Sequence, residues 1–440
     1  MALLADPPVF SYLPKSLPIR ICLVLPLNLF LSNISQLVTV AARGRSSLRG
    51  PEMRDVGLLA EAGVVARGGK ISWVGPMSEW VPSLSSGVQE FDARGMVVLP
   101  GFVDAHTHMM FAGSRVEEFA LRAEGLSYQQ IAERGEGILS TIRHVRAATK
   151  KELKRSTRNY LNGMLRHGTT TVEIKSGYGL DVDSEVKMLE AINELEREEM
   201  IAIVPTFIGA HAVPPEYAGD PGAYVDLVVE KMIPYVGGKS LASFCDVFCE
   251  GGYFDVTQSE RVLMEGKRHG MDAKVHADEL TPIGGAELAA RVGAVSADHL
   301  ENVTAPGIRA LREAGVVATV LPGVSFFLHH GYAPARTMID EDLAVAIASD
   351  FNPGSCMSYS MPMMMTIACT QMGLTPEEAI TATTLNGAAA LKMSDSVGSV
   401  EVGKNADLII APVSDYRMLA YHFAENHVHR TVKGGTLLEF

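Results

Sequence analysis

The stretch VVLPGFVDAHTH, residues 97–108, decides the fold of this chain. It begins as an apolar run and ends in two histidines, His106 and His108, with one residue between them. Such a run is typical of a strand buried on both faces of a parallel sheet. Because alternate residues of a strand share a face, His106 and His108 can aim two imidazoles at one point.

Seven further apolar runs follow this one, and amphipathic helical patterns such as 151–167, 184–198 and 286–291 lie between most of them. The eight predicted strands are 97–104, 170–175, 201–209, 245–250, 272–276, 294–299, 316–321 and 343–349. Strands that alternate with helices indicate βα units and a parallel sheet. Eight such units predict an α/β fold of the closed (β/α)₈ TIM-barrel type.

The sequence pattern at the two ends of the chain differs from that of the barrel region, because it predicts short strands separated by turns. Residues 27–98 contain strand patterns at 36–41, 63–67, 71–74 and 96–99, and residues 397–440 contain them at 399–402, 407–411, 430–433 and 436–439. Gly68-Gly69 and Gly434-Gly435 are typical hairpin turns. We expect both ends to pair into one small β-sandwich domain, with the barrel at 99–396.

Residues 1–26 form an N-terminal extension that the rest of the pattern does not explain. The apolar segment 17–32 is interrupted by Pro18, Arg20, Pro26 and Asn28, so it does not match a membrane span, and it lacks a clear small-residue cleavage site. We therefore expect a cytoplasmic enzyme whose first strand starts near Leu27.

Composition excludes some classes of partner. A net charge of −13 over 440 residues argues against a general nucleic-acid surface. The five cysteines are scattered and odd in number, which favours a reducing compartment over a disulfide framework. Cys245 and Cys249 lack a second pair that would complete a zinc site, and we interpret them as strand residues.

Polar residues follow the predicted strands, at the end of a barrel where active sites lie. Four of these strand ends carry histidine and a fifth carries aspartate; the residues are His106 and His108, His211, His276, His299 and Asp350. Any one histidine alone is more often a satisfied structural residue. Histidine and carboxylate together at one end of a barrel predict a metal site, because imidazole suits zinc or iron.

Several motifs together resemble the amidohydrolase superfamily. These are DAHTH after VLPGF, HADE at 276–279, ADHLE at 297–301 and SDFNPG at 349–354. Within it, FAGSR at 111–115, VEIKSGYGL at 172–180 and GAHAVP at 209–214 resemble a branch that acts in histidine degradation. The resemblance runs from about residue 27 to the C-terminus.

The resemblance implies a reaction and roles for named residues. It implies hydrolysis of the cyclic amide C–N bond of 4-imidazolone-5-propanoate to N-formimidoyl-L-glutamate, with one zinc or iron ion per subunit and a homodimer. His106, His108, His276 and Asp350 match the metal ligands, and Asp350, His299 and Glu279 match the catalytic groups. Arg115, Tyr178, His211, Glu279, Asn352, Gly354 and Ser355 match positions that contact the substrate.

The predicted number of metal ions depends on whether the fourth strand ends in a lysine. Many relatives bridge two metals with a carboxylated lysine at the end of that strand, but residues 245–250 contain no lysine, and Lys175 ends the second strand instead. One metal is therefore predicted, with Glu250 as an alternative contributor to a second site.

Two other functions compete with this one. Another cyclic-amide hydrolase or a ring deaminase of the same superfamily would share the metal ligands, but a neutral ring needs no counterpart to Arg115. A non-catalytic protein on a degenerate barrel would have lost ligands, whereas this chain keeps a full set. The sequence therefore favours an enzyme with a small anionic substrate.

Overall fold

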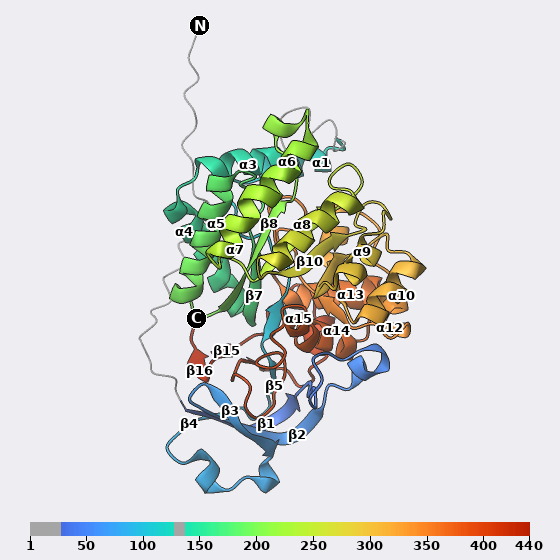
Figure 1. Cartoon of the computed structure of the whole chain (residues 1–440). Helices are drawn as coiled ribbons and strands as arrows, with labels where there is room; N and C mark the ends of the chain where they lie inside the picture. The colour runs from blue at the N-terminus through green and yellow to red at the C-terminus, as the bar shows by residue number, and fades with distance from the viewer. Residues whose placement is uncertain (1–27, 127–136) are drawn as a thin grey trace.

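The computed structural model describes residues 28–126 and 137–440, so the predicted extension 1–26 lies outside the described residues. A barrel surrounded by helices stands on a smaller sheet that contains the first and last strands of the described chain (Figure 1). The first strand, β1 (Leu29–Val38), begins two residues after the expected Leu27. No helix among the described residues is long and apolar enough to cross a membrane.

The smaller sheet is built from both ends of the chain, as predicted. Its order is β16-β15-β14-β5-β1-β2-β3, with β4 also paired to β1. Besides β1, its strands are β2 (Leu58–Arg67), β3 (Lys70–Pro76), β4 (Gln89–Asp92), β5 (Val97–Pro100), β14 (Leu408–Ala411), β15 (Arg430–Lys433) and β16 (Thr436–Leu438). Gly68-Gly69 joins β2 to β3 and Gly434-Gly435 joins β15 to β16, all four glycines with positive φ.

One predicted strand of the C-terminal part is wrong. Residues 399–402 form no strand; Val400 donates a single backbone hydrogen bond to the Thr39 carbonyl at 2.8 Å. The chain then turns at Gly403, whose φ of +93° ends any extended run.

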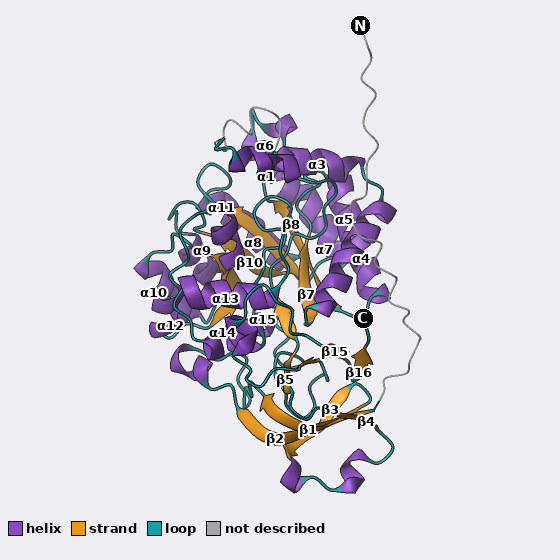
Figure 2. Cartoon of the chain, turned by 180° about the vertical axis from the view of Figure 1, so that it is seen from behind, coloured by secondary structure: helices purple, strands orange, loops and turns teal. Residues whose placement is uncertain are grey.

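The barrel consists of eight parallel strands, each paired with its neighbours in chain order, which confirms the predicted fold class. The strands are β6 (Phe102–Asp104), β7 (Thr169–Lys175), β8 (Ala202–Ala210), β9 (Phe244–Cys249), β10 (Asp272–Ala277), β11 (Ser296–His299), β12 (Val317–Val320) and β13 (Val345–Ile347). Helices cover the strands from outside (Figure 2).

The longer outer helices begin where the sequence offers caps. α4 (Lys150–Arg166) starts after a capping box of Thr149 and Glu152, and α8 (Val256–Arg268) after one of Asp255 and Gln258. The other α-helices of the described residues are α1 (Val116–Ala123), α3 (Ile138–Ala147), α5 (Val182–Glu198), α6 (Pro221–Leu227), α7 (Ile233–Gly238), α9 (Gly285–Val292), α10 (Ala305–Ala314), α11 (Pro322–Leu328), α12 (Ala335–Asp340), α13 (Met361–Gln371), α14 (Pro376–Thr383), α15 (Leu385–Ala389) and α16 (Met418–Tyr421).

The stretch 97–104 is not one barrel strand, which corrects the prediction. Its first half, β5, pairs with β1 and β14 of the smaller sheet, and only β6 belongs to the barrel. Gly101 is the joint: its N–H bonds to the Asp407 carbonyl at 2.9 Å, while the next residue, Phe102, bonds to Gly168 at 2.9 Å. Pro100 lacks an N–H with which to continue the ladder.

The barrel closes between β13 and β6 through a short bridge beyond the ends of both strands. Thr107 pairs with Phe351 in parallel. The Asp350 N–H donates to the His106 carbonyl at 3.0 Å, and the His108 N–H donates to the Phe351 carbonyl at 3.0 Å. The closing contact therefore lies at the predicted metal ligands.

The joint at Gly101 predicts a stability effect. A Cβ at this position would lie 2.3 Å from Thr170 Oγ1 and 2.4 Å from Thr170 Cγ2, and Thr170 is buried in β7. We expect Gly101→Ala to lower the free energy of unfolding by about 1–3 kcal/mol through overpacking, measured as a lower melting temperature. Gly238→Ala is the control, because nothing lies within 4 Å of its added Cβ; equal melting temperatures for the two variants would contradict the expectation.

Candidate metal centre and active site

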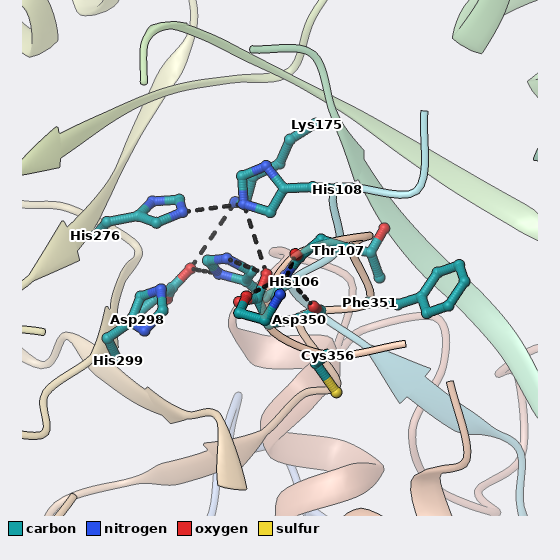
Figure 3. A network of polar contacts seen from close by, with 12 residues as sticks. His106, Thr107, His108, Lys175, His276, Asp298, His299, Asp350, Phe351 and Cys356 are labelled. Atoms are coloured by element: carbon teal, nitrogen blue, oxygen red, sulfur yellow. Dashed lines mark hydrogen bonds and ion pairs between the residues drawn. The ribbon is translucent and has the colours of Figure 1, made fainter. Parts of the chain in front are cut away.

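Three histidines and one aspartate meet at the carboxyl end of the barrel (Figure 3). His106 and His108 follow β6, His276 lies on β10, and Asp350 follows β13. The ring centroids of His106 and His276 are 4.5 Å apart, and Nε2 of His108 lies 3.1 Å from Nε2 of His276. Asp350 Oδ1 is 3.6 Å from His106 Nε2 and 3.7 Å from His108 Nε2. All four side chains are buried.

These four residues fit a single metal ion. His106 Nε2 and Asp350 Oδ1 are buried without a hydrogen-bond partner, a state that is costly unless another group satisfies them. Burial, together with nearby cations including Lys175, holds the pKa of His106 well below its usual value. Burial and neighbouring histidines do the same for the pKa of His108. Neutral imidazoles offer lone pairs, and three nitrogens with one carboxylate oxygen suit a tetrahedral site.

Two carboxylates that the sequence analysis missed set the direction of the histidine rings. His106 Nδ1–H donates to Asp298 Oδ2 at 2.7 Å, and His276 Nδ1 lies 3.0 Å from Asp246 Oδ2. The bond of His106 fixes the tautomer in which Nε2 carries the free lone pair, and the nearby Asp246 carboxylate favours the same tautomer of His276. The available signal was a charged residue inside an apolar strand, as Asp246 is in FCDVFC at 244–249.

The strand ends are strained where they present the site. His299 has φ +78° and Asp350 has φ +48°, both in the left-handed region. This conformation costs a residue with a Cβ roughly 1–2 kcal/mol. Strain of this kind is frequent where a side chain must be aimed for function.

His299 and two glutamates form a second buried group beside the metal ligands. His299 Nε2 is 3.6 Å from Glu279 Oε2, and His299 Nδ1 is 3.7 Å from Glu301 Oε2. Burial disfavours the charged imidazole, but the two carboxylates outweigh it and raise the pKa of His299 to about 10. Burial raises the pKa of Glu279 to about 7, against the opposing effect of His299. Glu301 is a further polar residue that the sequence analysis did not assign.

Glu250, the alternative contributor to a second metal, is engaged with the loop that carries Glu279. Its Oε2 accepts from the Leu280 N–H at 2.8 Å, and its Oε1 accepts from the Gly251 N–H at 2.7 Å and from the Thr281 hydroxyl. In the part of the chain that the structure describes, no candidate metal group includes Glu250. Its contacts support a role in positioning Glu279.

The predicted substrate residues Tyr178 and His211 line the same region. The His211 ring stacks on His108 with centroids 4.7 Å apart, and its Nδ1–H donates to the Gly177 carbonyl at 2.9 Å. Tyr178 lies 5.9 Å from His108 and 5.4 Å from His211, centroid to centroid. Burial raises the pKa of Tyr178, so its hydroxyl stays protonated and can donate.

Arg115 is held in place by a buried carboxylate. Its Nε and Nη2 donate to the two oxygens of Glu118 at 2.6 and 2.7 Å. Its Nη1 faces Gly354, where a Cβ would lie only 2.0 Å away. Gly354 is therefore a place where any side chain would collide with the guanidinium. The Glu118 pair leaves Nη1 and one N–H of Nη2 available.

Asn352 and Ser355 build the loop that brings Gly354 to Arg115. Asn352 Oδ1 accepts from the N–H groups of Gly354 and Ser355, both at 2.8 Å, and its Nδ2 donates to the Asp350 carbonyl at 2.7 Å. The Gly354 N–H, expected to bind substrate oxygen, is thus used within the loop. His329 and His330 are exposed at the end of α11 and lie apart from these contacts.

The geometry defines a metal-dependent hydrolase site on a TIM barrel, and the comparisons agree with that class. The amidohydrolase family matches residues 97–438, so the chain belongs to the amidohydrolase family. Imidazolonepropionase from Porphyromonas gingivalis is 47% identical over 94% of this chain and 97% of its own length. The enzyme of that name from Shouchella clausii is 45% identical over 93% of this chain and 92% of its own. Within the amidohydrolases, these relatives place the chain among the imidazolonepropionases.

Solved structures resemble the chain in fold. Guanine deaminase from E. coli superimposes with a TM-score of 0.72 at 15% identity, covering 94% of this chain and 98% of that one. A zinc-containing adenosine deaminase from Xanthomonas campestris gives a TM-score of 0.66 at 19% identity, with coverages of 94% and 93%. At these identities, the likeness concerns the barrel and its companion sheet.

The convergence of ligands predicts the effect of removing one. We expect His276→Ala to lose most of its bound zinc or iron during dialysis against a weak chelator, because one of four ligands and its bond to Asp246 disappear. Metal content per chain, measured by atomic emission, checks this. His269→Ala is the control, since His269 caps the end of α8 and contacts Glu265. Equal metal content in the two variants would remove His276 from the site.

Proposed function

We propose that this chain hydrolyses the ring C–N bond of 4-imidazolone-5-propanoate to give N-formimidoyl-L-glutamate in histidine degradation. The observation that carries the proposal is the cluster of His106, His108 and His276, with Asp350 Oδ1 3.6 Å from His106 and 3.7 Å from His108. Arg115, which can bind a carboxylate, faces Gly354 in the loop that follows Asp350. The relatives named imidazolonepropionase, similar over nearly the whole chain, support the choice of substrate.

We propose one zinc or iron ion per subunit, held by His106, His108, His276 and Asp350. When bound, such an ion supplies a water nucleophile at neutral pH and polarises the ring carbonyl. Three neutral imidazoles and one carboxylate would leave a divalent ion a net positive charge for this purpose. The bond from His106 to Asp298 and the close contact of His276 with Asp246 keep the nitrogen lone pairs directed at the ion.

Asp350, His299 and Glu279 are proposed to handle protons and charge. Asp350 accepts the proton of the attacking water and returns it to the departing ring nitrogen, so one water is consumed per C–N bond broken. His299 lies beside His106 and His276, with ring centroids 5.5 and 5.2 Å away, and donates a hydrogen bond to the oxygen that becomes negative. Such a donor contributes a few kcal/mol to transition-state stabilisation. Glu279, beside His299, accepts from the ring N–H.

Arg115 is proposed to bind the propionate carboxylate, with Tyr178 and His211 beside the ring. The guanidinium end left free by Glu118 can still make two hydrogen bonds to a carboxylate. This local positive group accounts for the binding of an anion by a chain of net charge −13. Asn352, Gly354 and Ser355 shape the wall behind it.

The proposal extends, on the resemblance alone, to a homodimer working in the cytoplasm on a small-molecule substrate, without nucleic acid or membrane. A ring deaminase on the same barrel would act on a neutral ring and would not need Arg115. The substrate's carboxylate is therefore the chemical feature that separates the two functions.

The first experiment measures loss of 4-imidazolone-5-propanoate by ultraviolet absorbance in the purified protein, before and after chelation. We expect consumption that stops when the metal is removed and returns when zinc or iron is added, because the water nucleophile depends on the ion. Formation of one N-formimidoyl-L-glutamate per substrate identifies the bond that breaks. A metal-loaded protein that leaves this substrate intact would contradict the proposed reaction.

Arg115 provides a test of substrate binding. We expect Arg115→Lys to raise KM about ten- to a hundredfold with a smaller change in kcat, since a charge-assisted hydrogen bond contributes about 1.5–3 kcal/mol and an ammonium lacks the fork. Steady-state kinetics checks this. Arg94→Lys is the matched control, because Arg94 is exposed in the smaller domain. A KM equal to that of the control would place the carboxylate elsewhere.

A further inference from the structure

Lys175 is a buried lysine at the end of β7 for which the proposed reaction has no use. Its side chain is fully buried inside the barrel and lies among the metal ligands in Figure 3. Its Nζ is 2.7 Å from Glu173 Oε2, 2.8 Å from Asp246 Oδ2 and 3.9 Å from Asp298 Oδ2. One ammonium therefore faces three carboxylates.

Two of these carboxylates are the acceptors that orient the histidine ligands. Asp298 Oδ2, near Lys175, accepts from His106 Nδ1, and Asp246 Oδ2 faces His276 Nδ1. The same oxygen of each aspartate thus contacts both Lys175 and a histidine ring. Lys175 links His106 on one side of the barrel to His276 on the other through two short chains of polar contacts.

The backbone of Lys175 holds the third histidine as well. The Lys175 N–H donates to the Thr107 carbonyl at 3.1 Å, and the Thr107 hydroxyl donates to the Glu173 carbonyl at 2.6 Å. These bonds fix the extended segment that carries His106 and His108 against β7. The main chain of Lys175 therefore helps to hold the segment that carries His106 and His108. Its side chain contacts the aspartates beside His106 and His276.

We propose that Lys175 is a positioning residue for the metal site: its ammonium holds the Asp246 and Asp298 carboxylates in orientation, so that His106 and His276 present Nε2 to the ion. The inference rests on the metal site proposed above. Without Lys175, Asp246 would lose the cation that lies 2.8 Å from its Oδ2. A buried carboxylate without such a partner is costly, so it would turn away from its present position. That change would release the histidine orientation that metal binding needs.

The neighbouring lysine, Lys274, reaches Asp298, but no ion pair among the described residues joins it to Asp246. Lys274 Nζ donates to the Ala105 carbonyl at 2.8 Å and lies 3.3 Å from Glu173 and 3.5 Å from Asp298. Among the ion pairs of the described residues, Lys175 is the lysine that reaches both Asp246 and Asp298. Burial works against its charge, but Asp246, Glu173 and Asp298 together raise the pKa of Lys175 above its usual value.

The test is the zinc affinity of the full chain, measured by competition with a chromophoric chelator and without any substrate. We expect Lys175→Met, which keeps the bulk and loses the charge, to bind zinc about ten- to a hundredfold more weakly, the usual effect of changing residues that orient ligands. The visible spectrum of the cobalt-loaded protein should change as well, because it reports ligand geometry. Lys433→Met is the matched control: Lys433 pairs with Asp407 in the smaller domain at 2.6 Å.

A second comparison covers the case in which Lys175→Met fails to fold. Lys175→Met with Glu173→Gln removes one cation and one carboxylate, which leaves the buried net charge unchanged. Glu173 makes no ion pair with a histidine in the part of the chain that is described. The single variant Glu173→Gln is its reference, and we expect the double variant to bind zinc at least tenfold more weakly than that reference.

Zinc affinity within twofold of the reference, with an unchanged cobalt spectrum, would overturn the role of Lys175. The zinc affinity of His276→Ala tests the metal site separately. If His276→Ala also keeps full affinity, the proposed site is wrong; if only the Lys175 variants keep it, the site stands and Lys175 is not its positioning residue. Both readouts are independent of the substrate, so a failure of the proposed reaction leaves this result unaffected.

Discussion

The site depends on the seam that closes the barrel, the backbone hydrogen bonds between residues 106–108 and 350–351. Two backbone hydrogen bonds, Asp350 N–H to His106 and His108 N–H to Phe351, join the last strand to the first at the residues that carry three of the four proposed ligands. The Ser349 hydroxyl and N–H add two bonds to Asp104 at 2.5 and 2.9 Å. The hydrogen bonds that close the barrel therefore also place His106, His108 and Asp350, and a shift of these bonds would move these three residues.

The barrel interior beneath this seam is charged. Glu173, Lys175, Asp246, Lys274 and Asp298 are all fully buried. Buried ion pairs add little net stability, because desolvation offsets their attraction, and removing one partner alone is costly. Such a network is better explained by what it orients than by what it stabilises. Here it lies directly behind the histidines, and the pKa shifts of His106 and His108 keep the rings neutral.

The residues proposed to bind the substrate are also held in place by short hydrogen bonds. The loop after β13 bonds to itself through Asn352, which brings Gly354 against the Arg115 guanidinium. Glu118 holds that guanidinium from the other side. Arg115 is thus held between a carboxylate and a glycine, which suits its proposed role in binding an anionic substrate. The Arg122 Nη2–H adds a 2.9 Å bond to the Gly354 carbonyl and braces the same loop.

The sequence by itself determined the barrel and its order of strands, because the alternation of apolar runs and helical patterns is local. It also placed the four proposed ligands at strand ends, while their role as ligands came from the resemblance to amidohydrolase motifs. Tertiary structure decided what depends on neighbours distant along the chain. It divided 97–104 between two sheets at Gly101, since the partners of β5 come from both ends of the chain. It left 399–402 outside the sheet. It also paired Lys175 with Asp246 and Asp298, 71 and 123 residues away in the chain, a contact that no local pattern can indicate because only barrel closure brings those strands together.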